Sequence, residues 1–148
     1  MTLLTHRGAG ASFPYAGQPT HILAGQDGQP PGFAAMEISM PARFAGPIPH
    51  AHDEFDEGFY VLSGRLMVGG DGELEEARPG SMFVAPRGQR HAFSNPFDEP
   101  ALVLGLWAPP GPALAFMRDV GAALRPDAPP DPDQMRDIYH RHASRLLP

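Results

Sequence analysis

Apolar residues recur at every second position in many short runs of this chain. Within residues 33–44, Met36, Ile38 and Met40 alternate with smaller or polar neighbours. A period of two is typical of a strand with one buried face. Further strand-like runs occur at close spacing before and after this segment: THILAG, IPHAH, GFYVLSG, SMFVAP, QRHAFSN and ALVLGLWA. About nine or ten short strands are expected, which favours an all-β fold, a closed or sandwiched antiparallel barrel.

Two connections between these strands have informative sequences. Residues 64–77, GRLMVGGDGELEEA, predict a hairpin that turns at the GGDG segment. The acidic segment DEFDE separates IPHAH from GFYVLSG and predicts a kink there. High counts of glycine, 17, and proline, 19, agree with a fold that has many tight turns.

The two ends of the chain have a different pattern from the middle. Residues 1–19 are expected to form an irregular arm, and residues 20–112 a β-barrel domain. Residues 113–148 are expected to be a helical appendage packed on the barrel. Helical spacing of apolar residues predicts a first helix over 113–124.

A second helix is predicted after a proline-rich linker. Asp131 is a suitable N-cap, and Pro132 is suited to the first helical position. One face of this helix would carry four residues, Met135, Ile138, His142 and Leu146. His140 and His142 would diverge by about 200° on such a helix, so they are not expected to share a ligand.

Composition narrows the function classes. The chain has 148 residues and no cysteine, which excludes disulfides and thiolate chemistry. Its net charge is −6, and its eleven arginines are scattered, so no nucleic-acid surface is expected. There is no apolar run of the roughly 20 residues that a membrane helix needs. The start of the sequence does not resemble a signal peptide, so a cytoplasmic location is expected.

Three histidines and one carboxylate form the candidate site. His50 and His52 are two residues apart, which on a strand places both on one face, roughly 6.6 Å apart. Glu57 follows at an offset that needs the predicted kink to reset the register. His91 must come from a neighbouring strand. A set of three nitrogens and one oxygen suits a divalent first-row metal, namely Fe, Mn, Ni, Cu or Zn.

The arrangement of these residues resembles the two motifs of the cupin superfamily. The first motif, G(X)5HXH(X)3–4E(X)6G, is matched from His50 to Gly64, with Phe44 where its leading glycine is usual. The second, G(X)5PXG(X)2H(X)3N, is matched at every position from Gly80 to Asn95. The resemblance implies a small double-stranded β-helix, the cupin or jelly-roll barrel, with His50, His52, Glu57 and His91 as the metal ligands. Asn95 is expected to pin a turn through backbone hydrogen bonds.

The segments around the second motif and the tail look like bacterial quercetin 2,3-dioxygenase-like proteins with one barrel. This narrower resemblance implies a dioxygenase that opens a flavonol-type ring with loss of carbon monoxide. Glu57 would be the catalytic base, or a metal ligand only, and O2 would be the second substrate. Two alternatives remain: a metal-dependent isomerase or cyclase that uses no O2, and a cupin that binds a small molecule without catalysis.

Several apolar residues are candidates for the wall of a substrate pocket, although core packing explains most of them equally well. An apolar pocket favours a small aromatic or enolisable hydroxy-carbonyl substrate. Because cupin barrels commonly pair, a homodimer is expected. The candidate pocket residues are Ile38, Met40, Phe55, Phe59, Met82, Phe93 and Trp107.

Overall fold

The computed structural model describes residues 3–26 and 31–148; residues 1–2 of the expected arm and residues 27–30 lie outside the described part. It has eleven strands and two helices in the described residues. The strands are β1 Ser12–Tyr15, β2 Gln18–Ala24, β3 Ala34–Met40, β4 His50–His52, β5 Asp56–Ser63, β6 Leu66–Gly69, β7 Glu75–Ala77, β8 Met82–Ala85, β9 Ala92–Ser94, β10 Ala101–Ala108 and β11 Ser144–Leu146. The helices are α1 Pro110–Ala123 and α2 Pro132–Arg141.

The strands form three antiparallel sheets. A six-stranded sheet has the order β1-β2-β3-β10-β5-β8, a three-stranded sheet the order β7-β6-β9, and β11 pairs with β4. Isolated bridges between Phe44 and Asn95 and between His50 and His91 add further links. Within the described residues the sheets do not close into one continuous barrel. The prediction of a mostly β fold with C-terminal helices is confirmed, and so is the β6–β7 hairpin.

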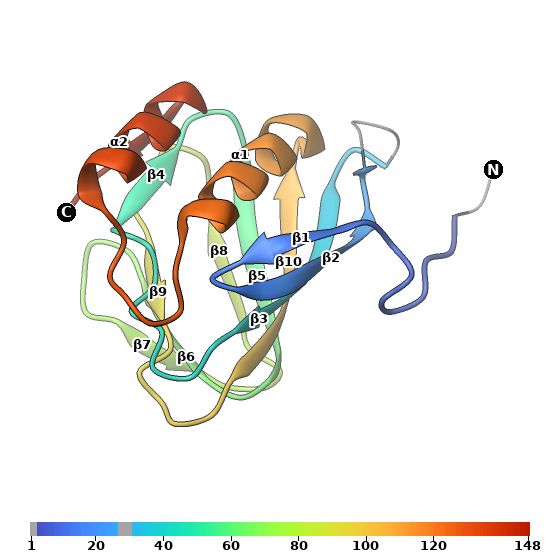
Figure 1. The fold of residues 1–148 in the computed structure, drawn as a ribbon, viewed down its shortest axis with the longest axis horizontal. Coiled ribbons are helices and arrows are strands. Elements are labelled where there is room, and N and C mark those ends of the chain that lie inside the picture. Colours follow the sequence, from blue (N-terminus) through green and yellow to red (C-terminus); the bar gives the residue numbers. More distant parts are fainter. Residues whose placement is uncertain (1–2, 27–30) are drawn as a thin grey trace.

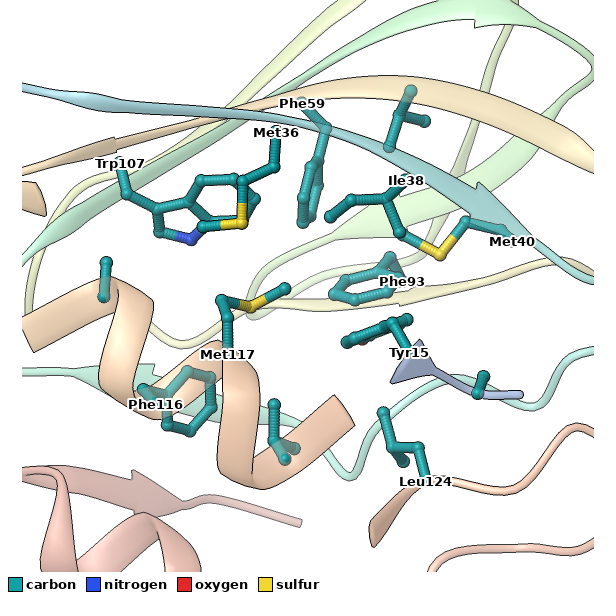
Figure 2. Packing of buried hydrophobic residues seen from close by; sticks show 14 of the residues in the cluster. Tyr15, Met36, Ile38, Met40, Phe59, Phe93, Trp107, Phe116, Met117 and Leu124 are labelled. Carbon is teal, nitrogen blue, oxygen red and sulfur yellow. The ribbon is translucent and has the colours of Figure 1, made fainter. Parts of the chain in front are cut away.

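The alternation of apolar residues in β3 and β10 builds the core. Val103 lies opposite Ile38, and Trp107 opposite Ala34, so side chains of the same inner face meet across the two strands. Gly105 lies between these two β10 residues, and a Cβ atom there would be 2.1 Å from the Trp107 ring. The absence of a side chain at this position therefore makes room for the indole. Figure 2 shows Trp107 and the β3 side chains facing Met117 of α1.

Helix α1 covers the inner face of the large sheet (Figure 1). Its apolar residues Leu114, Met117 and Val120 are buried there. The helix begins at Pro110, three residues earlier than predicted, because proline is tolerated in the first turn of a helix. Neither described helix is long and apolar enough to cross a membrane.

The prediction that the second helix continues to the end of the chain is wrong. Oδ1 of Asp131 accepts hydrogen bonds from the amides of Asp133 and Gln134, which confirms the predicted N-cap. The helix ends at Arg141, and Ala143 has a positive φ of 46° that reverses the chain. The next residues form β11, so Leu146 lies on a strand beside β4 rather than on the helical face.

The prediction of an irregular arm is wrong for residues 12–15. They form β1, which pairs with β2 so that Tyr15 lies opposite Gln18. Ala16 and Gly17 connect the strands with φ values of 48° and 75°. Positive φ at both central residues is the mark of a type I′ turn, in which Asn-Gly is usual and alanine is not. Because Ala16 is not a usual residue of such a turn, this hairpin had no signal in the sequence.

Candidate metal centre

Two neighbouring segments bring the three histidines together. His50 and His52 lie on β4, and His91 directly precedes β9. The amide of His50 donates to the carbonyl of His91 at 3.0 Å, and the amide of His91 donates back at 2.8 Å. Gly88, with a φ of 78°, makes the preceding turn, and its amide donates to the carbonyl of His52. The turn before His91 is therefore tied to the strand that carries the other two imidazoles.

Glu57 reaches the same point from a different sheet. Residues 53–55 break the strand pattern between β4 and β5, as the acidic segment predicts. Glu57 then lies on β5, opposite Trp107 of β10. Its Oε1 atom is 3.3 Å from Nε2 of His91, and its Oε2 atom is 3.5 Å from Nε2 of His52. The donor atoms of all four residues lie within 4.8 Å of one another.

Each imidazole has its Nδ1 atom engaged by a hydrogen bond, so Nε2 is the nitrogen that faces the cluster. Nδ1 of His50 is 2.8 Å from the carbonyl oxygen of Ile48, and Nδ1 of His91 is 3.1 Å from that of Gln89. A carbonyl oxygen only accepts, so Nδ1 carries the proton in both rings. Nδ1 of His52 is 2.7 Å from Oγ of Ser144. Metal-binding histidines have such hydrogen bonds at their second nitrogen.

The unsatisfied atoms of this cluster fit a metal ion. Nε2 of His52, Oε1 of Glu57 and Nε2 of His91 are buried without a hydrogen-bond partner among the described residues. Buried polar atoms without a partner are costly, and a cation would satisfy all three. Two ligands about 2.1 Å from one ion lie about 3.0–3.4 Å apart at angles of 90–109°, close to the separations of Glu57 from His91 and His52. The residues therefore fit one divalent first-row ion, and its identity is open.

The protonation states also suit a cation. Burial raises the pKa of Glu57, but the imidazoles of His52 and His91 outweigh it and hold the pKa well below its usual range. Burial and the neighbouring imidazoles lower the pKa of His50 well below 6.5. Burial also lowers the pKa of His52. At His91 burial is outweighed by the Glu57 carboxylate, which raises the pKa, so a cation bound there would take the place of a proton. A charged carboxylate and neutral imidazoles are the forms that ligate metals.

Aromatic side chains from four elements or loops enclose the cluster. The indole Nε1 of Trp107 donates to Oε2 of Glu57 at 2.8 Å. The Phe55 ring stacks on His52 at 4.3 Å between centroids. From the C-terminal helices, Phe116 meets His52 edge-on at 4.6 Å, and Tyr139 meets His50 at 4.9 Å. None of the four cluster residues is more than 3% exposed.

A small internal cavity lies against the cluster. It offers about 10 Å³, which is at the lower limit for one water molecule. Two tyrosines line it together with His50 and Glu57: Tyr15 of β1 and Tyr139 of α2. Burial, with the negative charge of Glu57 adding to it, raises the pKa of both phenols well above 10. Both phenols are therefore neutral and can donate hydrogen bonds.

The predicted pocket residues fall into three groups. Phe55 and Trp107 contact the cluster, and Phe59 and Phe93 line the cavity. Ile38 and Met40 are fully buried in the core. Met82 is 47% exposed and lies with Val84 in an apolar depression that Glu57 and Trp107 also line. It does not line the cavity beside the imidazoles.

Residues outside the motifs complete the site and were missed in the sequence. They are Tyr15, Phe116, Tyr139 and Ser144. The spacing of apolar residues in the two helices predicted that each has a buried face. It did not predict that these faces pack on the imidazoles. Asn95 acts as expected: its side-chain amide donates to the carbonyls of Pro41 and Glu99, and its Oδ1 accepts from the amide of Phe97.

Comparison with known proteins agrees with this geometry. Residues 36–108 match the family model described as "Cupin domain". The chain is 35% identical over 92 residues to germin-like protein subfamily 2 member 3 of Arabidopsis thaliana, covering 59% of this chain and 41% of that protein. It is 32% identical over 98 residues to polyketide synthase CurC of Streptomyces cyaneus, covering 65% of this chain and 62% of that protein. The chain thus spans less than two thirds of either relative.

Solved structures include KdgF from Halomonas sp., which is 30% identical and superposes with a TM-score of 0.53. The match covers 62% of this chain and 77% of KdgF. The matched family segment contains all four residues of the cluster. Three of them lie on β4 and β5, and His91 directly precedes β9. The chain belongs to the cupin superfamily.

Proposed function

We propose that this protein is a metal-dependent enzyme that activates a small aromatic or enolisable hydroxy-carbonyl compound, and that it acts as a dioxygenase. The observation that carries the proposal is the buried cluster of three imidazoles and one carboxylate, enclosed by aromatic side chains. A divalent ion held by His50, His52, Glu57 and His91 would lower the pKa of a substrate hydroxyl and stabilise its anion.

Glu57 is the candidate general base. Its pKa is held well below the usual range, so its carboxylate is charged at neutral pH. A base with a low pKa takes protons effectively only from an acidic group. An enol or a phenol beside a carbonyl is such a group, whereas a simple alcohol is not. The hydrogen bond from Trp107 holds Oε2, which leaves Oε1 to ligate or to accept a proton.

The walls of the site favour an apolar substrate. The cavity is lined by Phe59, Phe93 and Phe116, and its polar groups beyond the cluster are the hydroxyls of Tyr15 and Tyr139. Among the described residues no arginine lines the cavity, so a phosphate or a sugar acid would lack a cationic partner. A flat, aromatic hydroxy-carbonyl compound would instead stack on these rings and receive hydrogen bonds from the phenols.

Access to the centre requires a movement of the covering helices. The cavity holds no more than about one water, and Phe116 and Tyr139 pack directly on the imidazoles. A substrate of aromatic size therefore enters only when α1 or α2 moves. Closure afterwards would exclude water from a reactive anion.

A cyclase that uses no O2 is the second candidate, because the cluster could stabilise an enolate without an oxidant and the chain is similar to a protein named polyketide synthase, CurC. The same carboxylate would take a proton from the carbon beside a carbonyl. Such a reaction predicts that solvent deuterium is incorporated at that carbon under anaerobic conditions. The dioxygenase reaction does not require this exchange.

The test combines metal analysis with assays in the presence and absence of oxygen. Protein from its own host is analysed for bound metal and then offered flavonols and simpler hydroxy-carbonyl compounds. Consumption of O2 with ring-opened product in air, and no turnover under anaerobic conditions, is expected. Glu57→Gln should abolish turnover, whereas the exposed His140→Ala should not. Turnover that persists without O2 would exclude the dioxygenase, and deuterium exchange would then identify the cyclase.

A further inference from the structure

The hydrogen-bond partner of His52 comes from outside the cupin segment. His50 and His91 use carbonyl groups only two residues away along the chain. His52 instead uses Oγ of Ser144, which is 92 residues away and belongs to β11. Ser144 lies beyond residues 36–108, which match the family model. The orientation of one of the three imidazoles therefore depends on the last strand of the chain.

The hydroxyl of Ser144 can take only one role toward His52. Oγ donates its proton to the carbonyl oxygen of His142 at 3.1 Å. Since a hydroxyl has a single proton, Oγ must accept from Nδ1–H of His52. This fixes the tautomer in which Nε2 of His52 has a free lone pair. That Nε2 atom is buried and has no hydrogen-bond partner among the described residues.

Backbone pairing holds the serine in register with the histidine. β11 pairs with β4 so that Ser144 lies directly opposite His52. The amide of Asp53 donates to the carbonyl of Ala143, and the Arg145 guanidinium forms an ion pair with Asp53 at 2.9 Å. Figure 1 shows α2 beside β4, close to the C-terminus. The serine is 5% exposed, so water does not compete effectively for its hydroxyl.

We propose that Ser144 is a positioning residue that sets the tautomer and ring orientation of His52, so that the C-terminal strand completes the metal centre. The inference rests on the metal binding proposed above. Hydrogen-bond partners of metal ligands typically contribute about 10–100-fold to metal affinity. Loss of the Ser144 hydroxyl is expected to weaken metal binding by about 10-fold or more.

A matched pair of variants isolates the hydroxyl. Ser144→Thr and Ser144→Val have nearly the same shape and differ in one hydroxyl group, so packing strain affects both alike. Zn²⁺ and Co²⁺ affinities are measured by competition with a chelator. Threonine should retain an affinity close to wild type, whereas valine should lose about 10-fold relative to threonine. Ser144→Ala adds no atoms and should behave like valine, with Ser39→Ala on β3 as the control that leaves affinity unchanged.

A spectroscopic measurement reports on His52 itself. Proton NMR of the Co²⁺-loaded protein should show three shifted, exchangeable ring N–H signals, one from each imidazole. In Ser144→Ala, one of these signals should broaden or disappear through faster exchange, while two remain.

The outcomes separate this inference from the proposed function. If the wild-type protein binds neither ion, the metal-dependent function itself fails. If it binds and Ser144→Ala equals wild type in both affinity and N–H signals, Ser144 has no positioning role. Equal affinities of the threonine and valine variants, with alanine at the wild-type value, would overturn the inference in the same way.

Discussion

The indole nitrogen of Trp107 donates a hydrogen bond to the carboxylate of Glu57, across the pair of strands β10 and β5. The distance is 2.8 Å, and both side chains are at most 3% exposed. The contact lies within the large sheet and orients the carboxylate that this sheet contributes to the candidate metal centre. It holds one oxygen of the carboxylate and leaves the other toward His91.

Replacing Trp107 with phenylalanine should weaken both stability and metal binding. A buried hydrogen bond to a charged group contributes about 1.5–3 kcal/mol, and the loss of indole volume adds to this cost. Urea unfolding measures the free energy change, and chelator competition measures the metal affinity. Trp107→Phe with unchanged affinity would show that the indole packs the core without orienting Glu57.

Removal of the metal should lower the thermal stability of the protein. A ligand that binds only the folded state stabilises it by about 2.7 kcal/mol when present at 100 times its dissociation constant. Unfolding midpoints are therefore measured with and without EDTA. The wild type and His140→Ala should both lose stability with EDTA, whereas His91→Gln should not respond. A wild-type midpoint that EDTA leaves unchanged would contradict metal binding by the folded protein.

The sequence predicted that four residues gather in one cluster, because the positions of the histidines depend on short local segments. His50 and His52 share a face of one strand, and the turn at Gly88 fixes the position of His91. The alternation in β3 likewise predicted its buried face. Periodicity and spacing therefore predicted those features that depend on a single strand or a single turn.

The missed features depend on contacts between distant segments. Strand β11 has only three residues, Ser144 to Leu146, which are too few to show an apolar period. They form a strand because they pair with β4. In SMFVAP, alternation defines two faces but does not say which one is buried. The structure exposes Met82 and Val84 and buries Ala85. Met82, a predicted pocket residue, therefore lies on the outer face.

Asp56 should support the turn that precedes His91 in a pH-dependent way. Its carboxylate accepts from the backbone amide of Arg87 at 2.8 Å and from the Arg87 guanidinium. These hydrogen bonds lower the pKa of Asp56 from 3.8 to about 2. A depressed pKa means that the contribution to stability is complete above the unfolded-state pKa and disappears as the pH falls through the folded-state value.

Asp56→Asn should therefore be less stable than the wild type by a constant amount from neutral pH to about pH 4. Below that pH the difference should shrink, and it should vanish only below pH 2. Chemical unfolding at a series of pH values measures it. Because the pair is solvent-exposed, added salt should reduce the difference as well. A difference that persists unchanged at pH 2 would indicate that asparagine alters packing rather than charge.

Gly105→Ala should destabilise the protein because the indole of Trp107 occupies the space that a side chain would need. A Cβ atom at this position would lie 2.1 Å from one ring atom and 2.4 Å from another. Overpacking of a core typically costs about 1–3 kcal/mol, and relief of this clash requires the indole to move away from Glu57. Metal affinity should therefore fall together with the free energy of unfolding. Gly111→Ala is the control, since nothing lies within 4 Å of its Cβ position and alanine favours the helix α1 there. If Gly105→Ala lost stability but kept full metal affinity, the position of the indole would not govern the carboxylate.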